Sequence, residues 1–220
     1  MGTPAQGEVT APRAVVVIGA SAGGVEALRT LVAAFPAGFP AAVCVTLHIP
    51  RTGISVLPQI LSRAGALPAT HPHDGTPLRA GHVHVAPVDL HLLLQDGLVR
   101  LSPGALEHGL RPAIDPLFRS AALQWGPRAA GVVLSGSGHD GTAGLAAITA
   151  LGGGAFAQDP AEALFPSMPR GAAQRIPGCL VLPVAELGPA LVAFVTAAAT
   201  HRPGAAPEAD NPVAGPSPAA

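Results

Sequence analysis

The stretch AVVVIGASAGG, residues 14–24, decides how the rest of the chain is interpreted. Its first five residues are all apolar, which is typical of a strand buried on both faces of a parallel sheet. A turn of small residues follows, with Ser21 at its centre. Residues 19–23 fit G-x-S-x-G, the sharp turn that exposes a nucleophilic serine in many hydrolases. A Gly-rich turn also binds pyrophosphate in dinucleotide-binding domains, so the turn alone leaves both alternatives open.

Apolar runs and helical stripes alternate along the rest of the chain. Further buried strands are predicted at residues 41–47, 129–134, 155–158 and 179–182. Helices are predicted at residues 25–35, 54–63, 114–125, 142–151 and 191–199. This alternation favours a doubly wound α/β fold of three layers, α/β/α, with a mostly parallel sheet in the middle.

The region 67–101 differs from the rest of the chain, because it contains short segments of alternating apolar and polar residues. Asp96-Gly97 separates two apolar runs, and this is a strong signal for a two-residue hairpin turn. We expect an antiparallel hairpin unit beside the parallel sheet, formed by the short segments 83–85, 92–94 and 98–101.

Composition excludes several classes of protein. Hydrophobic residues make up 49% of the chain, charged residues 11%, and the formal net charge is −1. With no basic stripe, a nucleic-acid partner is not expected. The longest apolar candidate for a membrane span, residues 190–200, is shorter than the roughly 18 residues required, so no membrane insertion is expected. Cys44 and Cys179 lie in apolar runs, which is typical of core thiols in a cytoplasmic protein.

The domain boundaries follow from periodicity. Residues 1–12 show none and predict a disordered lead-in. After His201 the composition is dominated by Pro, Ala and Gly, which predicts a disordered tail over residues 201–220. Residues 13–200 therefore form one expected domain.

Three chemically active residues follow three predicted strands. Ser21 follows the first strand, His48 the second, and Asp140 lies in the loop after the strand at 129–134. Ligands bind at the carboxyl ends of such strands, so the three can meet at one edge. An imidazole activates a serine hydroxyl, and a carboxylate orients the imidazole. The order Ser–His–Asp differs from the Ser–Asp–His order of α/β-hydrolases.

Each of these residues also has a structural interpretation. Asp140 suits an N-cap of the helix that follows, His48 a histidine bonded to backbone, and Ser21 a turn residue. The convergence of all three favours catalysis. The Gly-rich loop 135–141 and the N–H of Ala22 could supply oxyanion donors. The dinucleotide alternative is weakened because residues 46–50 contain no acid for a ribose.

A cluster of histidines occupies the hairpin region and raises the question of a metal site. We favour local hydrogen bonding instead. The residues concerned are His71, His73, His82, His84 and His91.

Several separate motifs extend from about residue 15 to about residue 194. They are IGASAGG (18–24), HIP (48–50), AGHVHVAPVDLH (80–91), RPAID (111–115), LSGSGHDG (134–141), AQD (157–159) and MPR (168–170). In their order and spacing these motifs resemble the catalytic domain of the CheB family, the protein-glutamate methylesterases of bacterial chemotaxis.

The resemblance implies a methylesterase-like catalytic domain over residues 13–200. It implies hydrolysis of γ-glutamyl methyl esters on a methylated chemoreceptor-like protein, with glutamine deamidation in some relatives. Ser21 is then the nucleophile, His48 the base and Asp140 the orienting acid, and the backbone N–H of Ser137 falls where the family has an oxyanion donor. No cofactor or metal is implied.

The chain departs from the family pattern in three ways. Ala22 stands where Thr is common, and His139 where Asn is common before the acid. Residues 1–12 leave no room for a receiver domain, so constitutive activity or a regulator in trans is expected. The alternative is an altered or inactive relative that acts as a nucleotide- or partner-binding module.

Overall fold

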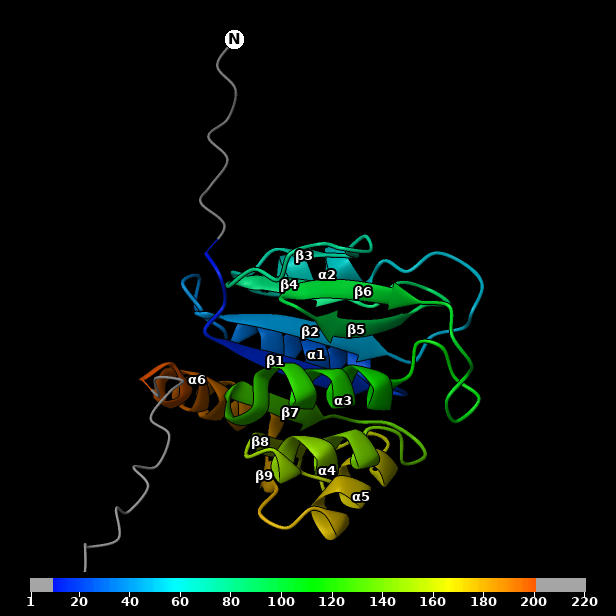
Figure 1. The fold of residues 1–220 in the computed structure, drawn as a ribbon. Helices are drawn as coiled ribbons and strands as arrows, with labels where there is room; N and C mark the ends of the chain where they lie inside the picture. The colour runs from blue at the N-terminus through cyan, green and yellow to red at the C-terminus, as the bar shows by residue number, and fades with distance from the viewer. Residues whose placement is uncertain (1–9, 201–220) are drawn as a thin grey trace, which may run out of the picture.

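Seven parallel strands form the central sheet of the structure, a computed structural model that describes residues 10–200. The strand order is β3-β4-β2-β1-β7-β8-β9, and every pair of neighbours is parallel (Figure 1). The strands are β1 (Ala14–Ala20), β2 (Ala41–Leu47), β3 (Ala69–Thr70), β4 (His82–Val85), β7 (Ala129–Val133), β8 (Gly154–Gln158) and β9 (Leu180–Leu182). The predicted doubly wound α/β fold is confirmed.

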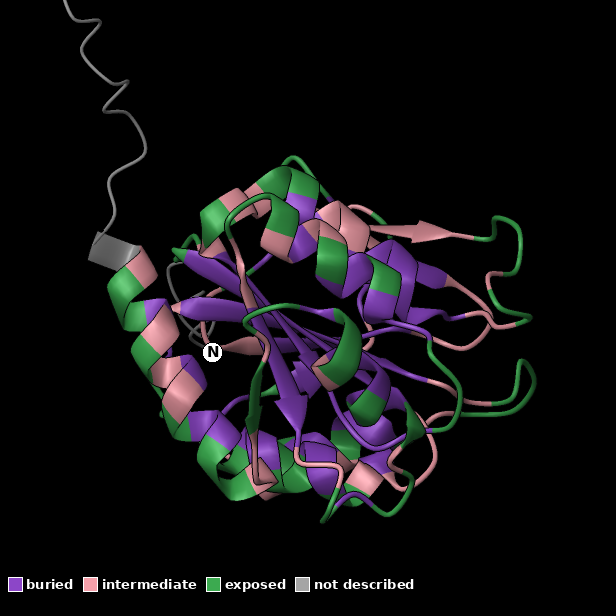
Figure 2. Cartoon of the chain, turned by 90° about the horizontal axis from the view of Figure 1, so that it is seen from below, coloured by how far each residue is buried: buried purple, intermediate pink, exposed green. Residues whose placement is uncertain are grey.

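Helices cover both faces of this sheet. One face carries α1 (Gly24–Ala33), α2 (Leu57–Ala64) and α6 (Val184–Thr200). The other carries α3 (Ile114–Trp125), α4 (Thr142–Ala150) and α5 (Ser167–Arg175). The short 3-10 helix η1 (Gly126–Arg128) directly follows α3. Figure 2 shows the buried strands enclosed between helices that turn their buried sides inward.

The strand β1 explains why the core has two halves. All seven of its residues are buried, and alternate side chains point to opposite faces. Val16 and Ile18 pack in the cluster with α1, whereas Val15 and Val17 pack in the cluster with α3. Burying each such side chain contributes roughly 1.5–3 kcal/mol, so this uninterrupted apolar run stabilises both layers at once.

The predicted hairpin is present, but with fewer strands than expected. β5 (His91–Gln95) and β6 (Leu98–Ser102) pair antiparallel, and Asp96 and Gly97 at the turn have φ angles of 53° and 74°. Placing the segment 83–85 in this unit was wrong. It belongs to β4, which pairs parallel with β2 and β3, because its side chains are buried on both faces of the main sheet.

Two helices differ from their predictions. α5 was not predicted, because Pro169 and Gly171 interrupt its apolar pattern. Proline in a first turn removes only an N–H that the helix does not use. α6 begins at Val184, well before the predicted start at 191, and contains Pro189. A Cβ on Gly188 would lie 2.3 Å from the Cβ of Ala34, so glycine allows α6 to approach α1 closely.

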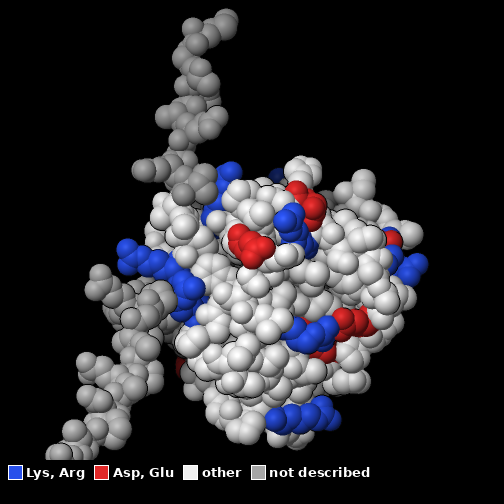
Figure 3. Space-filling view, in the orientation of Figure 1, with Lys and Arg blue, Asp and Glu red and all other residues white. Residues whose placement is uncertain are grey.

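The predicted disorder of residues 1–9 and 201–220 lies outside the described residues, and the domain boundaries stay predictions. At the described start, the carbonyl of Thr10 accepts a hydrogen bond from the Ala80 N–H at 3.1 Å. None of the helices described here is long and apolar enough to cross a bilayer. On the face in Figure 3, the arginines lie scattered, several of them beside Asp or Glu, rather than gathered in a stripe.

Candidate active site

The three candidate residues follow three neighbouring strands. β1 ends directly before Ser21, β2 ends directly before His48, and β7 leads into the loop that contains Asp140. β1 lies between β2 and β7 in the sheet, so this is the point at which the winding of the sheet reverses. In open parallel sheets such a point is where ligands bind.

Close packing fixes the turn that carries Ser21. Gly23 has a φ of 71°, a left-handed conformation that favours glycine, and a Cβ there would lie 2.8 Å from the Ser135 Oγ. The Ser21 N–H donates to the Ser135 carbonyl at 2.9 Å, and the His48 N–H donates to the Ala20 carbonyl at 3.0 Å. The turn is therefore tied to both neighbouring strand ends.

His48 and Asp140 meet across the strand ends. His48 Nε2 lies 2.8 Å from Asp140 Oδ2, and the two side chains are 7% and 3% exposed. An ionised carboxylate only accepts hydrogen bonds, so Nε2 carries the proton and Nδ1 keeps its lone pair. The structure thus places a buried carboxylate where it selects one tautomer of the imidazole.

Asp140 also accepts three backbone hydrogen bonds. They come from Ile114 at 2.7 Å, Asp115 at 3.0 Å and Gly141 at 2.8 Å. Burial raises the pKa of the Asp140 carboxyl, but the hydrogen bonds from His48, Ile114 and Asp115 outweigh it, so the pKa lies below its usual value. The alternative that Asp140 caps the following helix was wrong: it bonds the first amides of α3, while α4 has Gly141 at its N-cap with no side-chain bond.

Ser21 is near this pair without being bonded to it. Among the described residues, neither its Oγ nor Nδ1 of His48 makes a hydrogen bond. Catalytic hydrogen bonds are often open before substrate binds and close in the complex. The structure therefore joins His48 to Asp140 and leaves the hydroxyl and the basic nitrogen unpaired at adjacent strand ends.

The loop 135–141 runs beside the Ser21 turn. A Cβ on Gly136 would lie 2.8 Å from the Ser21 Cβ, so no side chain fits between them. The N–H groups of Ala22 and Ser137 donate no hydrogen bond within the described part of the chain. Both N–H groups are therefore available to a further hydrogen-bond acceptor.

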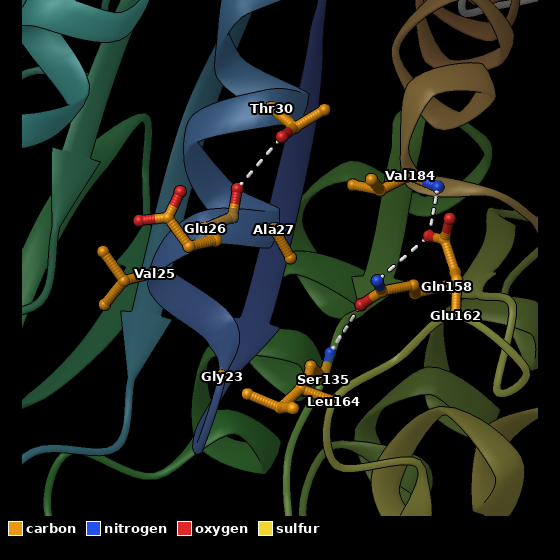
Figure 4. A pocket seen from close by; sticks show the side chains of 10 residues that line it. All are labelled: Gly23, Val25, Glu26, Ala27, Thr30, Ser135, Gln158, Glu162, Leu164 and Val184. Atoms are coloured by element: carbon orange, nitrogen blue, oxygen red, sulfur yellow. Dashed lines mark hydrogen bonds between the residues drawn. The ribbon is translucent and has the colours of Figure 1, made fainter.

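Ser135 joins the two loops, and the motif search did not single it out. Its Oγ donates to the Ala22 carbonyl at 2.8 Å and accepts from the Phe165 N–H at 3.0 Å. Its own N–H donates to Gln158, which in turn donates to Glu162 (Figure 4). A pocket of about 380 Å³ lies on this side, and none of the three candidate residues lines it. The sequence contained a sign of this contact in the LSGSG motif, but the pattern does not tell which of its two serines joins the loops.

Comparison with known proteins gives the family. The family model for CheB methylesterase matches residues 16–191. The chain belongs to the CheB methylesterase family. A protein-glutamate methylesterase/protein-glutamine glutaminase of Anaeromyxobacter dehalogenans (strain 2CP-C) is 42% identical over 177 residues, which is 80% of this chain and 52% of that protein. A protein of the same name from Symbiobacterium thermophilum is 37% identical, over 84% of this chain and 51% of its own length.

A solved structure agrees with this assignment to the CheB methylesterase family. The crystal structure of the Thermotoga maritima CheB methylesterase catalytic domain superposes with a TM-score of 0.79 and 30% identity. It covers 83% of this chain and 98% of that one. The chain therefore spans about half the length of the curated CheB relatives above, and nearly the whole of a catalytic domain.

In this CheB family member the hairpin-region histidines mostly form local hydrogen bonds. His71 bonds the Val85 carbonyl at 3.0 Å, and His82 bonds the Thr70 hydroxyl at 2.9 Å. Burial, with His82 and Arg79 nearby, lowers the pKa of His84 to about 3. Side chains of the types that can bind a metal gather elsewhere in the described structure, at His108, Asp115 and Asp140.

Proposed function

We propose that this chain hydrolyses γ-methyl esters of glutamyl residues in a chemoreceptor-type protein. Ser21 is the nucleophile, His48 the base and Asp140 the orienting acid. The observation that carries the proposal is the buried 2.8 Å bond between His48 and Asp140 beside the Ser21 turn. The names of the relatives support the reaction class.

In the first step Ser21 Oγ attacks the γ-carbonyl carbon and gives its proton to His48. Nδ1 is the acceptor, because Nε2 is already protonated towards Asp140. This use of the two nitrogens is the reverse of that in chymotrypsin-type triads. The negative oxygen that forms is bound by the N–H groups of Ala22 and Ser137, each worth roughly 10²–10³ in rate. The C–O bond then breaks, and methanol leaves with the proton from His48.

In the second step water hydrolyses the glutamyl ester of Ser21. His48 removes a proton from water, which attacks the acyl carbon, and returns the proton to Ser21 Oγ as that group leaves. The product is a free glutamate carboxylate. A glutamine substrate gives the same acyl-enzyme with ammonia as the leaving group, so one site serves both activities in the relatives' names.

A protein substrate needs apolar contacts around the serine. Leu164 is 74% exposed and packs beside Gly23, next to the nucleophile. Ile54, in the loop after β2, is 94% exposed. Exposed apolar side chains that gather in one patch are typical of surfaces that bind another protein. We propose that they contact the substrate, in the cytoplasm, where the free thiols of Cys44 and Cys179 stay reduced.

The experiment is intact-mass labelling with a serine-directed fluorophosphonate, followed by methanol release from methylated receptor. We expect a single adduct on Ser21, lost in Ser21→Ala and slowed by orders of magnitude in His48→Ala. Ser167→Ala is the matched control, because Ser167 is exposed and near the site but outside the triad. A folded wild type that never labels would overturn the proposal and favour the binding-module alternative.

A further inference from the structure

Asp115 lies beside Asp140, and the two carboxylates exchange helix caps. Asp115, in the first turn of α3, accepts hydrogen bonds from the N–H of Gly141 at 3.0 Å and of Gly144 at 2.7 Å, where α4 begins. Asp140, just before α4, accepts from the N–H of Asp115 at 3.0 Å. A helix leaves its first amides unsatisfied, so each aspartate fixes the start of the other's helix.

A second histidine contacts this pair of carboxylates. His108 Nε2 lies 3.0 Å from Asp115 Oδ2 and 3.9 Å from Asp140 Oδ1. The bond to Asp115 raises the pKa of His108 above its usual value, burial opposes this, and the charges of Asp140, Asp115 and Glu107 add to the rise. The loop that carries His108 is held to α3, because Glu107 in this loop forms an ion pair with Arg119 of α3 at 2.6 Å.

The result is two His–Asp pairs side by side. His48 bonds Asp140 and His108 bonds Asp115, each through Nε2. The N–H of Gly141 donates to both carboxylates, at 2.8 Å and 3.0 Å. Asp115 is 1% exposed, so these donors replace water around its charge. The mechanism above uses only the first pair.

These groups do not form an open cation site. The ligand atoms of His108, Asp115 and Asp140 lie within 4.8 Å of one another. However, each carboxylate oxygen of the two aspartates already accepts a hydrogen bond from an N–H group. A cation would have to displace donors that hold both aspartates in place. The cluster is therefore better interpreted as hydrogen-bonded support for Asp140.

We infer that Asp115 and His108 form a second His–Asp pair that positions the Asp140 carboxylate, and through it the His48 imidazole. This inference rests on the proposed function. Asp115 accepts a hydrogen bond from the N–H of Gly141, the residue next to Asp140. His108 in turn forms a hydrogen bond with the Asp115 carboxylate. Other groups that can carry positive charge face the cluster from three elements: Arg119 on α3, Arg175 on α5 and His139 in the loop before α4.

The test compares Asp115→Asn, His108→Leu and His108→Gln in two measurements. The first is the rate of fluorophosphonate labelling at Ser21. The second is histidine ¹⁵N NMR in a Ser21→Ala background, which reports the Nε2–H proton of His48 without any turnover. Asp96→Asn and His73→Gln are the matched controls, because both residues are exposed and lie outside the cluster.

We expect Asp115→Asn to slow labelling about 10- to 100-fold, as for other groups that orient a functional histidine, and to weaken the His48 Nε2–H signal. His108→Leu acts in the same direction. His108→Gln keeps an N–H donor and recovers most of the rate. A purely structural role would change thermal stability without moving the His48 signal or giving this recovery.

Wild-type labelling rates and an unchanged His48 signal in Asp115→Asn and His108→Leu would overturn the inference. The His108 side chain is 36% exposed, so we expect the His108 variants to fold. They therefore test the inference even if Asp115→Asn fails to fold. A wild type that never labels refutes the proposed function alone, because the NMR measurement still tests whether Asp115 and His108 position His48.

Discussion

Asp140 caps α3, the helix that contains Asp115, and Asp115 in turn caps α4, the helix that follows Asp140. This exchange of hydrogen bonds joins α3 to α4 at the end of β7. The carboxylate that holds His48 is thereby fixed by two helices rather than by a loop alone. Functional groups keep a productive geometry when rigid elements position them. The exchange explains why Asp140 keeps one orientation although it directly follows the exposed loop 137–139.

The first prediction concerns Asp140→Asn. Asparagine offers an N–H group where His48 Nε2 also donates, so the imidazole adopts the wrong tautomer. If the three residues act as the proposed triad, we expect the labelling rate at Ser21 to fall by about 10⁴-fold, as the same change does in a Ser-His-Asp triad. Fluorophosphonate labelling followed by mass spectrometry measures this. Asp159→Asn is the control, because the Asp159 side chain accepts a hydrogen bond only from the nearby Ala161 N–H among the described residues.

The same variant also tests the depressed pKa of Asp140. A lowered folded-state pKa contributes stability above the unfolded value of 3.8, and this stability is lost as pH falls through the folded pKa. Asp140→Asn should therefore be less stable than wild type at pH 7. The difference should shrink in strongly acidic solution. An equal difference at every pH would contradict this origin.

The second prediction concerns His108, whose pKa is raised. The stabilisation by its cation is fully present below pH 6.5 and is lost as pH rises through the folded-state pKa. Wild type should unfold at a higher temperature than His108→Gln in mildly acidic buffer, and the two should converge in alkaline buffer. Thermal unfolding at a series of pH values measures this. His73→Gln is the control for the substitution itself, because His73 is exposed and lies outside the cluster.

Much of the fold could be predicted because buried parallel strands are continuous apolar runs. The ends of β2 and of α3 match their predicted residues. The pairing of β4 could not be predicted, since its His-Val alternation is the pattern of a half-exposed antiparallel strand. Only the neighbours on both faces, which are distant in sequence, bury His84.

The site was predictable in part for a similar reason. Ser21, His48 and Asp140 were singled out because strand ends in a parallel sheet converge. The structure does join His48 to Asp140, whereas the role of Ser21 stays a prediction. Asp115 was not singled out, because an acid in a helical first turn has an ordinary explanation as a favourable charge near the helix dipole. Its bonds to Gly141 and Gly144 depend on how two helices pack, which no local pattern contains.

The third prediction is that Gly136→Ala disrupts the site from the loop side. A Cβ at this position would lie 2.2 Å from the Met168 Sδ and 2.8 Å from the Ser21 Cβ. Met168 is fully buried, so α5 or the turn that carries Ser21 must shift. We expect a loss of about 1–3 kcal/mol of stability by urea unfolding, together with slower labelling. Gly38→Ala, where a Cβ meets nothing, is the matched control.

The fourth prediction separates substrate binding from chemistry. Leu164 is 74% exposed beside the turn that carries Ser21, and it is not one of the three proposed catalytic residues. Leu164→Ser should raise KM for methylated receptor and leave fluorophosphonate labelling unchanged, because the small probe does not need the apolar surface.

Leu123 provides the control for Leu164. It is 75% exposed but lies near the end of α3 that is remote from Asp140, so Leu123→Ser removes the same apolar area from another place. Only the Leu164 variant should affect receptor demethylation, measured as methanol release at several receptor concentrations. Equal effects of the two variants would mean that general surface hydrophobicity, rather than a contact beside Ser21, governs recognition of the receptor.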